Sequence, residues 1–150
     1  MKLNMLLKKK NNEIIKIDAE KSVFEAVRLL NQHKIGSLLV MNADKKLEGI
    51  VTERDILFKC LNNEKDNKNT KVSEIMTTKD NLIIGTTEDT LSYAMKVMTS
   101  KRIRHLPIVD QEKVIGLVSI GDILKEVLDQ SENEVKLLRE YITNPYGINL

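Results

Sequence analysis

Two short segments place a hydroxyl and a carboxylate three residues apart, at the expected start of a helix. They read GIVTERD at residues 49–55 and GLVSIGD at residues 116–122. The hydroxyl at such a position can cap free backbone N–H groups of the first turn. Those N–H groups, with the positive end of the helix dipole, also favour an anion such as phosphate. The carboxylate lies one turn on, on the same side, where it can accept two hydrogen bonds from a ribose diol.

A capped helix with an acidic first turn is the simpler explanation of one such motif on its own, because caps of this kind are common. Two copies at matched places in the chain favour a pair of ligand sites instead. Both explanations require that each motif joins a strand to a helix.

The two motifs belong to an internal repeat. Residues 20–61 and 88–128 have closely similar sequences, with an offset of 68 up to about Ala43 and of 67 from about Leu47. Two copies of one unit typically pack about a pseudo-two-fold axis, and ligands bind in clefts at the seam.

Each repeat has the same predicted order of elements. A helix with its apolar residues at i, i+3, i+4 and i+7 comes first, followed by a buried strand, a turn, a second strand and a second helix. An extended segment precedes each repeat, so that the fold class is α/β (or α+β) with two β-α-β-β-α units. The apolar positions that define the helices are Val23, Ala26, Val27 and Leu30, Leu91, Ala94, Met95 and Met98, Ile56, Leu57, Cys60 and Leu61, and Ile123, Leu124, Val127 and Leu128.

The segments outside the repeats complete the predicted organisation. Residues 1–61 form an N-terminal segment with repeat 1, and residues 62–71 an exposed polar linker. Residues 72–128 form repeat 2 with its lead-in, and residues 129–150 a C-terminal helix and tail. Ser131 and Glu134 have capping-box spacing, which predicts that this last helix begins there. Lys8–Lys10 is read as a solvated turn after a short helix.

Composition argues against several classes of protein. The formal net charge is +2 and aromatic residues make up 3% of the chain, which argues against a nucleic-acid binder. No stretch approaches the roughly 20 apolar residues of a membrane span. A single cysteine, Cys60, rules out an internal disulfide, and we expect a cytoplasmic protein.

The repeats resemble tandem CBS domains (the cystathionine-β-synthase type) paired as a Bateman module, of the stand-alone bacterial or archaeal kind. The resemblance covers about residues 13–128 and rests on HKIGSLLV, IRHLPIVD, GIVTERDIL and GLVSIGDIL. It implies binding of adenosine compounds (AMP, ADP, ATP, NAD(H) or S-adenosylmethionine) in clefts between the repeats. It also implies that the modules pair into a flat homodimer.

The resemblance implies a role for each matching residue. Asp55 and Asp122 would hold ribose hydroxyls, and Thr52 and Ser119 would contact ribose or phosphate. The lead-in strands, at residues 15–18 and 84–86, would supply backbone hydrogen bonds to the base. The full set of predicted nucleotide-binding residues is Lys34, Ile35, Gly36, Ser37, Thr52, Arg54, Asp55, Ile84, Thr86, Arg104, His105, Pro107, Ser119 and Asp122.

The two repeats differ in charged residues at positions that could contact a phosphate group. Arg54 corresponds to Gly121, and Arg104 and His105 correspond to Gly36 and Ser37. An arginine can bind a phosphate bidentately, whereas a glycine cannot. We therefore expect one good nucleotide site and one that is weaker, empty or differently occupied.

These features predict a non-enzymatic regulatory module that senses adenine or nicotinamide nucleotides, without a catalytic cofactor or metal, and that acts on an unidentified partner protein. The alternative is a structural or dimerisation module whose sites are vestigial or bind S-adenosylmethionine. An enzyme is disfavoured because the chain has no G-x-S-x-G, H-E-x-x-H, C-x-x-C, Walker or G-x-G-x-x-G motif.

Overall fold

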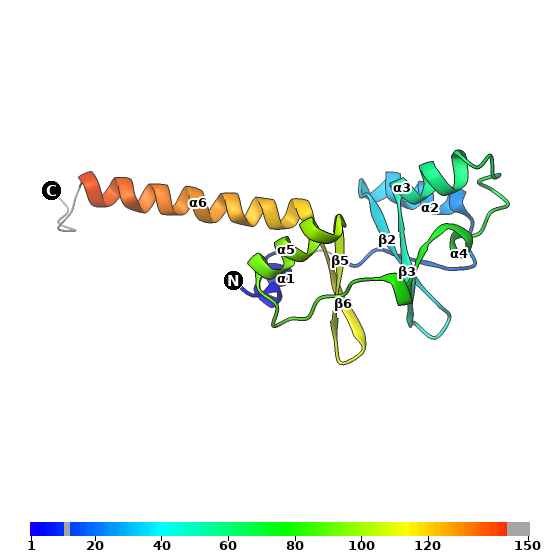
Figure 1. Ribbon diagram of the computed structural model, residues 1–150, viewed down its shortest axis with the longest axis horizontal. Helices are drawn as coiled ribbons and strands as arrows, with labels where there is room; N and C mark the ends of the chain where they lie inside the picture. Colours follow the sequence, from blue (N-terminus) through cyan, green and yellow to red (C-terminus); the bar gives the residue numbers. More distant parts are fainter. Residues whose placement is uncertain (11–12, 144–150) are drawn as a thin grey trace. The chain divides into compact units, whose positions relative to one another are not determined.

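The computed structural model describes residues 1–10 and 13–143, which form two compact units (Figure 1). Unit 1 consists of Met1–Asn11, Thr87–Leu106 and Val118–Leu150, and unit 2 consists of Asn12–Thr86 and Pro107–Leu117. The predicted mixture of helices and strands in two repeats with a long C-terminal helix is confirmed.

Unit 2 is built on a four-stranded sheet in the order β1-β2-β3-β4. Strand β1 (Lys16–Asp18) runs parallel to β2 (Ser37–Met41), and β2 forms an antiparallel hairpin with β3 (Leu47–Thr52). The short β4 (Thr77–Thr78) pairs with β3. The buried strands β2 and β3 are rich in branched apolar residues, as expected for strands covered on a face by helices.

Helix α2 (Val23–His33) covers this sheet and has caps at both ends. The Ser22 side chain accepts a hydrogen bond from the Glu25 N–H, and Lys34 ends the helix in a left-handed conformation (φ 53°). Val23, Ala26 and Leu30 are buried, but Val27, which the pattern predicts on the same face, is exposed. The buried face is therefore narrower than the spacing predicts.

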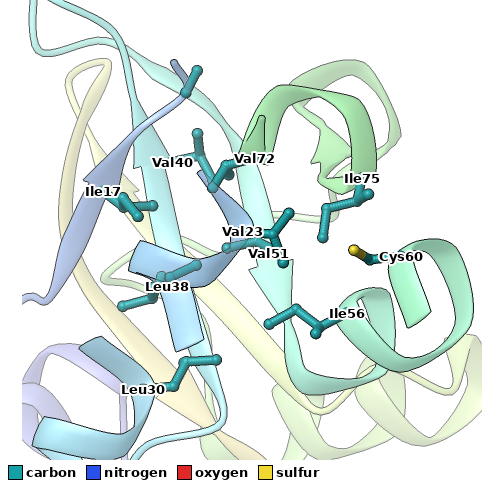
Figure 2. Packing of buried hydrophobic residues seen from close by; sticks show 12 residues of the cluster. Ile17, Val23, Leu30, Leu38, Val40, Val51, Ile56, Cys60, Val72 and Ile75 are labelled. Atoms are coloured by element: carbon teal, nitrogen blue, oxygen red, sulfur yellow. The ribbon is translucent and has the colours of Figure 1, made fainter. Parts of the chain in front are cut away.

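The core of unit 2 joins this helix to the sheet and to two later helices (Figure 2). Helix α3 (Glu53–Asp55) continues into a π-helical segment, η1 (Ile56–Leu61), and α4 (Val72–Ile75) follows. A 3-10 turn, η2 (Lys79–Asn81), comes after β4. The labelled core residues in Figure 2 are Ile17, Val23, Leu30, Leu38, Val40, Val51, Ile56, Cys60, Val72 and Ile75.

The polar segment 62–71 does more than connect the repeats. The carbonyl groups of Asn67 and Thr70 accept hydrogen bonds from the N–H groups of Phe24 and Val23, both at 2.9 Å. Thr70 itself is buried. This segment therefore satisfies backbone donors of the first turn of α2, which no residue of that helix can satisfy.

Unit 1 contains helices α1 (Leu3–Lys10), α5 (Leu91–Lys101) and α6 (Ile120–Thr143). The strands β5 (His105–Asp110) and β6 (Lys113–Ser119) pair with each other and contribute residues to both units. Leu3 and Leu6 of α1 are buried, and the Leu3 N–H donates to the Asp89 carbonyl at 2.8 Å. The chain start is thus fixed beside the beginning of α5.

Two predictions about secondary structure differ from the structure. The C-terminal helix does not begin at Ser131, because α6 continues from Ile120 to Thr143 and no glycine or proline between Asp122 and Thr143 interrupts it. The second lead-in, predicted as a strand at residues 84–86, forms within the described residues only one isolated parallel bridge, from Gly85 to Ile108.

The second helix of each repeat is buried along a narrower edge than predicted. Ile56 and Cys60 are buried, but Leu57 and Leu61 are 53% and 52% exposed. In repeat 2, Ile123 is likewise buried, whereas Leu124, Val127 and Leu128 are exposed. The four apolar positions of each of these helices cover about a third of the helix surface. Only part of this apolar face packs against the core.

Gly49 lets β3 and β4 approach closely. A Cβ atom added there would overlap the carbonyl oxygen of Thr77, which belongs to the backbone and cannot swing away. We expect Gly49→Ala to lower the free energy of unfolding by about 1–3 kcal/mol, as overpacking does. The measurement is urea unfolding followed by circular dichroism.

The matched control is Gly121→Ala, at the start of α6. A Cβ there would lie 3.6 Å from the Ser119 Oγ, an ordinary contact. This change should be neutral or stabilise the helix by up to about 1 kcal/mol. Equal effects of the two substitutions would contradict the close approach at Gly49.

Candidate functional site

The first predicted junction, in unit 2, is a closed capping box between Thr52 and Asp55. The Asp55 N–H donates to the Thr52 Oγ1 at 3.2 Å, and the Thr52 N–H donates to the Asp55 Oδ2 at 3.0 Å. The Thr52 hydroxyl also donates to that Oδ2 at 3.1 Å. The structure thus shows the capping role of both residues directly.

A lysine that the sequence reasoning missed balances the charge of Asp55. The Asp55 side chain is 9% exposed, and the Lys59 Nζ lies 2.9 Å from its other oxygen, Oδ1. The spacing i, i+4 between the two residues is the signal that could have found this pair.

The second junction, in unit 1, repeats the geometry. The Ser119 N–H donates to the Asp122 Oδ2 at 2.8 Å, and the Asp122 N–H donates to the Ser119 Oγ at 3.1 Å. The residue that corresponds to Lys59 here is Glu126, which is itself an acid and is buried. Repeat 2 therefore lacks the internal cation of repeat 1 and carries a second carboxylate in its place.

Helix α1 supplies a cation for each of these two carboxylates. The Lys10 Nζ lies 2.8 Å from the Asp122 Oδ2, and the Lys9 Nζ lies 2.9 Å from the Glu126 Oε1. The interpretation of Lys8–Lys10 as a solvated turn is wrong, because these residues form the last turn of α1 and two of them make ion pairs. The side chains of Lys10 and Asp122 are only 22% and 25% exposed, so this pair is shielded more than a surface salt bridge.

These contacts lower the pKa of both acidic side chains, Asp122 and Glu126. Burial acts to raise the pKa of Asp122, but the hydrogen bonds from Lys10 and Ser119 outweigh it, and the pKa lies below its ordinary value. For Glu126 the hydrogen bond from Lys9 is the largest influence, and it lowers the pKa against a smaller opposing effect of burial. Both side chains are therefore held as carboxylates.

Protein acceptors already use several of the N–H groups at each helix start. The Glu53 N–H donates to the Gly36 carbonyl at 3.1 Å, and at the matching place the Ile120 N–H donates to the Arg104 carbonyl at 2.8 Å. These bonds confirm the correspondence of the repeats at atomic level. They also mean that the N–H groups of Glu53 and Ile120 are already engaged and are not available to an anion.

The remaining predicted site residues fall into two groups. In unit 2, Gly36 and Ser37 lie beside Thr52, because Ser37 pairs with Thr52 in the sheet. In unit 1, the backbone bond just described brings Arg104 next to the Ser119–Asp122 junction. The residues with exposed side chains are Lys34, Arg54, Ile84, Thr86 and Arg104, those of intermediate exposure are Ile35, Gly36 and His105, and the buried ones are Ser37 and Pro107.

Two of the predicted nucleotide-binding residues have structural roles in the chain. Lys34 is the left-handed residue that ends α2, as Arg102 is for α5. The Arg54 guanidinium lies 6.0 Å from the ring centre of Phe58, in a cation–π arrangement on the surface of unit 2.

Comparison with known proteins settles the family. The model of the CBS domain matches residues 10–62 and 72–129. The chain belongs to the CBS domain family. The "CBS domain-containing protein CBSX3, mitochondrial" of Arabidopsis thaliana is 39% identical over 127 residues, which are 83% of this chain and 62% of that protein. The CBS domain-containing protein YhcV of Bacillus subtilis is 33% identical over 122 residues, 81% of this chain and 82% of its own length.

A solved structure agrees with this membership. A proposed signal-transduction protein with CBS domains from Burkholderia ambifaria superposes with a TM-score of 0.81 at 36% identity, over 86% of this chain and 95% of that chain. The match to inosine-5'-monophosphate dehydrogenase of Bacillus subtilis covers 70% of this chain but only 21% of the enzyme. Similarity to that enzyme is therefore confined to a small part of it.

The described residues also lack the features of two other kinds of site. Within residues 1–10 and 13–143, no helix is long and apolar enough to cross a membrane. The same residues contain no cluster of three or more histidine, cysteine or acidic side chains that could hold a metal ion.

The Lys10–Asp122 pair should make stability depend on pH. Because the pKa of Asp122 is lowered in the folded state, its stabilisation is present above the ordinary value of 3.8 and is lost as the pH falls through the folded-state pKa. We expect Lys10→Met to lower the free energy of unfolding by up to about 1 kcal/mol at pH 7, and the difference from the wild type to shrink below about pH 4. Urea unfolding between pH 3 and pH 7 measures both effects.

Lys8→Met is the matched control, since Lys8 is an exposed residue of the same helix turn. It should leave the unfolding free energy unchanged throughout this range. A Lys10→Met variant as stable as Lys8→Met at pH 7 would show that the ion pair contributes nothing.

Proposed function

We propose that this chain is a non-enzymatic regulatory module that binds an adenine nucleotide (AMP, ADP, ATP or NAD(H)). The observation that carries the proposal is the pair of matched hydroxyl–carboxylate junctions, one in each unit, in a chain of the CBS domain family. Each junction holds the carboxyl group of an aspartate in a fixed position, which is what recognition of a ribose diol requires.

The junction of unit 1 is the better candidate for the nucleotide. A carboxylate offers roughly four acceptor positions on its two oxygens, and the bonds from the Ser119 N–H and from Lys10 both go to the Oδ2 of Asp122. Asp55 accepts bonds on both oxygens, from Thr52 at Oδ2 and from Lys59 at Oδ1. This difference supports one stronger and one weaker site.

Positive charge near the unit 1 junction suits a phosphate group. Lys10 lies at the carboxylate, and Arg104 has an exposed side chain and a backbone bonded to the first residue of α6. A ribose that binds Asp122 competes with Lys10 for that carboxylate, and a displaced ammonium group would then be close to the ligand phosphates. Lys10 thus favours a phosphorylated nucleotide over the bare nucleoside.

Paired exposed faces support a homodimer. Leu57 and Leu61 in unit 2 correspond to Leu124 and Leu128 in unit 1, and all four are about half exposed or more. Apolar residues grouped on matched helices are typical of interfaces between subunits. A CBS-CP12 protein of cyanobacteria, 26% identical with a TM-score of 0.72, is described as hexameric.

The regulated process lies outside the two units, and we propose that a separate partner protein or the dimer itself carries the output. We also propose a cytoplasmic location, although the Arabidopsis relative is named as mitochondrial. The location rests on the single cysteine, Cys60, which suits a reducing compartment.

Thermal unfolding against AMP, ADP, ATP, NAD⁺, NADH and S-adenosylmethionine tests the function. A ligand at about 100 times its dissociation constant should add roughly 2.7 kcal/mol to the stability of the folded state. Asp122→Asn, which keeps a capping oxygen but removes the charge, should weaken the binding of the active ligand at least about tenfold. Isothermal titration calorimetry measures that loss.

Asp129→Asn is the control, because Asp129 is an exposed acid on the same helix. It should bind as the wild type does. If no ligand stabilises the protein, the chain is instead a dimerisation module with vestigial sites; if only S-adenosylmethionine does, the ligand class changes but the site stands.

Arg104→Ala should distinguish phosphate recognition from ribose recognition. We expect its loss of affinity to increase from adenosine to AMP to ATP, because each added phosphate strengthens a charge-assisted interaction. Lys101→Ala, which removes an exposed cation of α5, is the control. Equal losses for adenosine and ATP would remove Arg104 from the phosphate site.

A further inference from the structure

The second half of α6 has no covering in the described chain. Every residue from Val127 to Thr143 is exposed, and Figure 1 shows this part of the helix, in orange to red, extending beyond α1 and α5. A helical segment of this length is only marginally stable in water unless a face of it packs against something. The segment also carries large apolar side chains, so a partner surface is required.

The apolar residues follow a heptad. Counted from Leu124, the steps of 4, 3, 4, 3 and 4 residues place one continuous stripe along the helix, which is the spacing of coiled-coil a and d positions. We call this stripe the seam, and its residues are Leu124, Leu128, Ser131, Val135, Leu138 and Ile142. Five of the six are apolar, and these five are between 44% and 75% exposed.

The residue types in the seam favour two parallel strands. Two of the three a positions of the seam carry Val135 and Ile142, with Leu128 at the third, and the d positions other than Ser131 carry Leu124 and Leu138. β-Branched residues at a combined with leucine at d are the combination that selects parallel dimers over larger bundles. The polar Ser131, at another d position, lowers the stability of the pair and helps to fix its register.

Charges beside the seam also select the parallel orientation. In a parallel, in-register pair the g position of one helix meets the following e position of the other, which brings Glu134 to Arg139 of the second copy, twice by symmetry. An antiparallel pair with the same seam would place Glu132 against Glu132 and Lys125 against Arg139. The first arrangement pairs opposite charges, and the second pairs like charges.

We propose that two copies of this chain associate through α6 as a parallel, in-register coiled coil along the seam from Leu124 to Ile142. The coiled coil extends the subunit contact well beyond the region matched by the CBS domain model, which ends at residue 129. It does not depend on nucleotide binding, so a failure of the nucleotide assays leaves it standing.

Disulfide trapping in the full chain tests the geometry directly. Val135→Cys places a thiol at an a position, where the two copies meet at the same residue, and mild oxidation should give a covalent dimer. Asn133→Cys, at the outward f position two residues away, should stay uncross-linked, as should the wild type, whose Cys60 is buried.

Each other outcome overturns the proposal. Cross-linking only in a mixture of Ser131→Cys and Val135→Cys chains would show an antiparallel pair. No cross-link at all, with the chain still dimeric in sedimentation, would show that the copies meet elsewhere. A monomeric chain would show that the seam does not join two copies.

Charge reversal gives an independent measurement. Glu134→Arg and Arg139→Glu should each weaken self-association roughly threefold to tenfold in sedimentation equilibrium, and the double variant should restore it. Residues five apart do not face each other on one helix, so the restoration must come from two chains. Failure of the double variant to recover would contradict the parallel register.

Discussion

A shielded carboxylate at the start of each second helix constrains the rest of the structure. Asp55 and Asp122 cap backbone groups that would otherwise lack partners, and a carboxylate in such a place needs a cation. In unit 2, Lys59 supplies it from the next turn of the same helix. In unit 1 that position is Glu126, and the cations come from Lys9 and Lys10, the latter 112 residues away.

The parts of the fold that depend on local pattern were predictable from the sequence. The hairpins and the hydroxyl–carboxylate caps follow from spacings of a few residues, and the repeat follows from the similarity of residues 20–61 and 88–128. The Lys10–Asp122 pair was not, because remote segments that meet leave no periodic signal. The burial of Ile56 without Leu57 was also not predictable, since periodicity locates a face but not how wide a strip of it meets the core.

In the candidate site, too, the local features could be predicted from the sequence and the contacts with remote segments could not. Sequence identified the capping pairs and the contrast between Arg104 and Gly36, and it proposed ligand roles for them. It missed that each carboxylate also pairs with a lysine of the chain, so that a ligand there would compete with the protein's own groups. The two junctions look alike in sequence but differ in this respect, because the lysine is local in unit 2 and remote in sequence in unit 1.

The separation of α1 from the repeat that follows it bears on how the chain is made. Residues 1–10 lie next to repeat 1 in sequence but belong to unit 1, whose other parts begin at Thr87. During synthesis from the N-terminus, domains generally fold as they emerge. Here α1 precedes repeat 1 in the chain but must wait until Glu126 has been added before both Lys9 and Lys10 find their partners, so its packing is secured only after most of repeat 2 has been made.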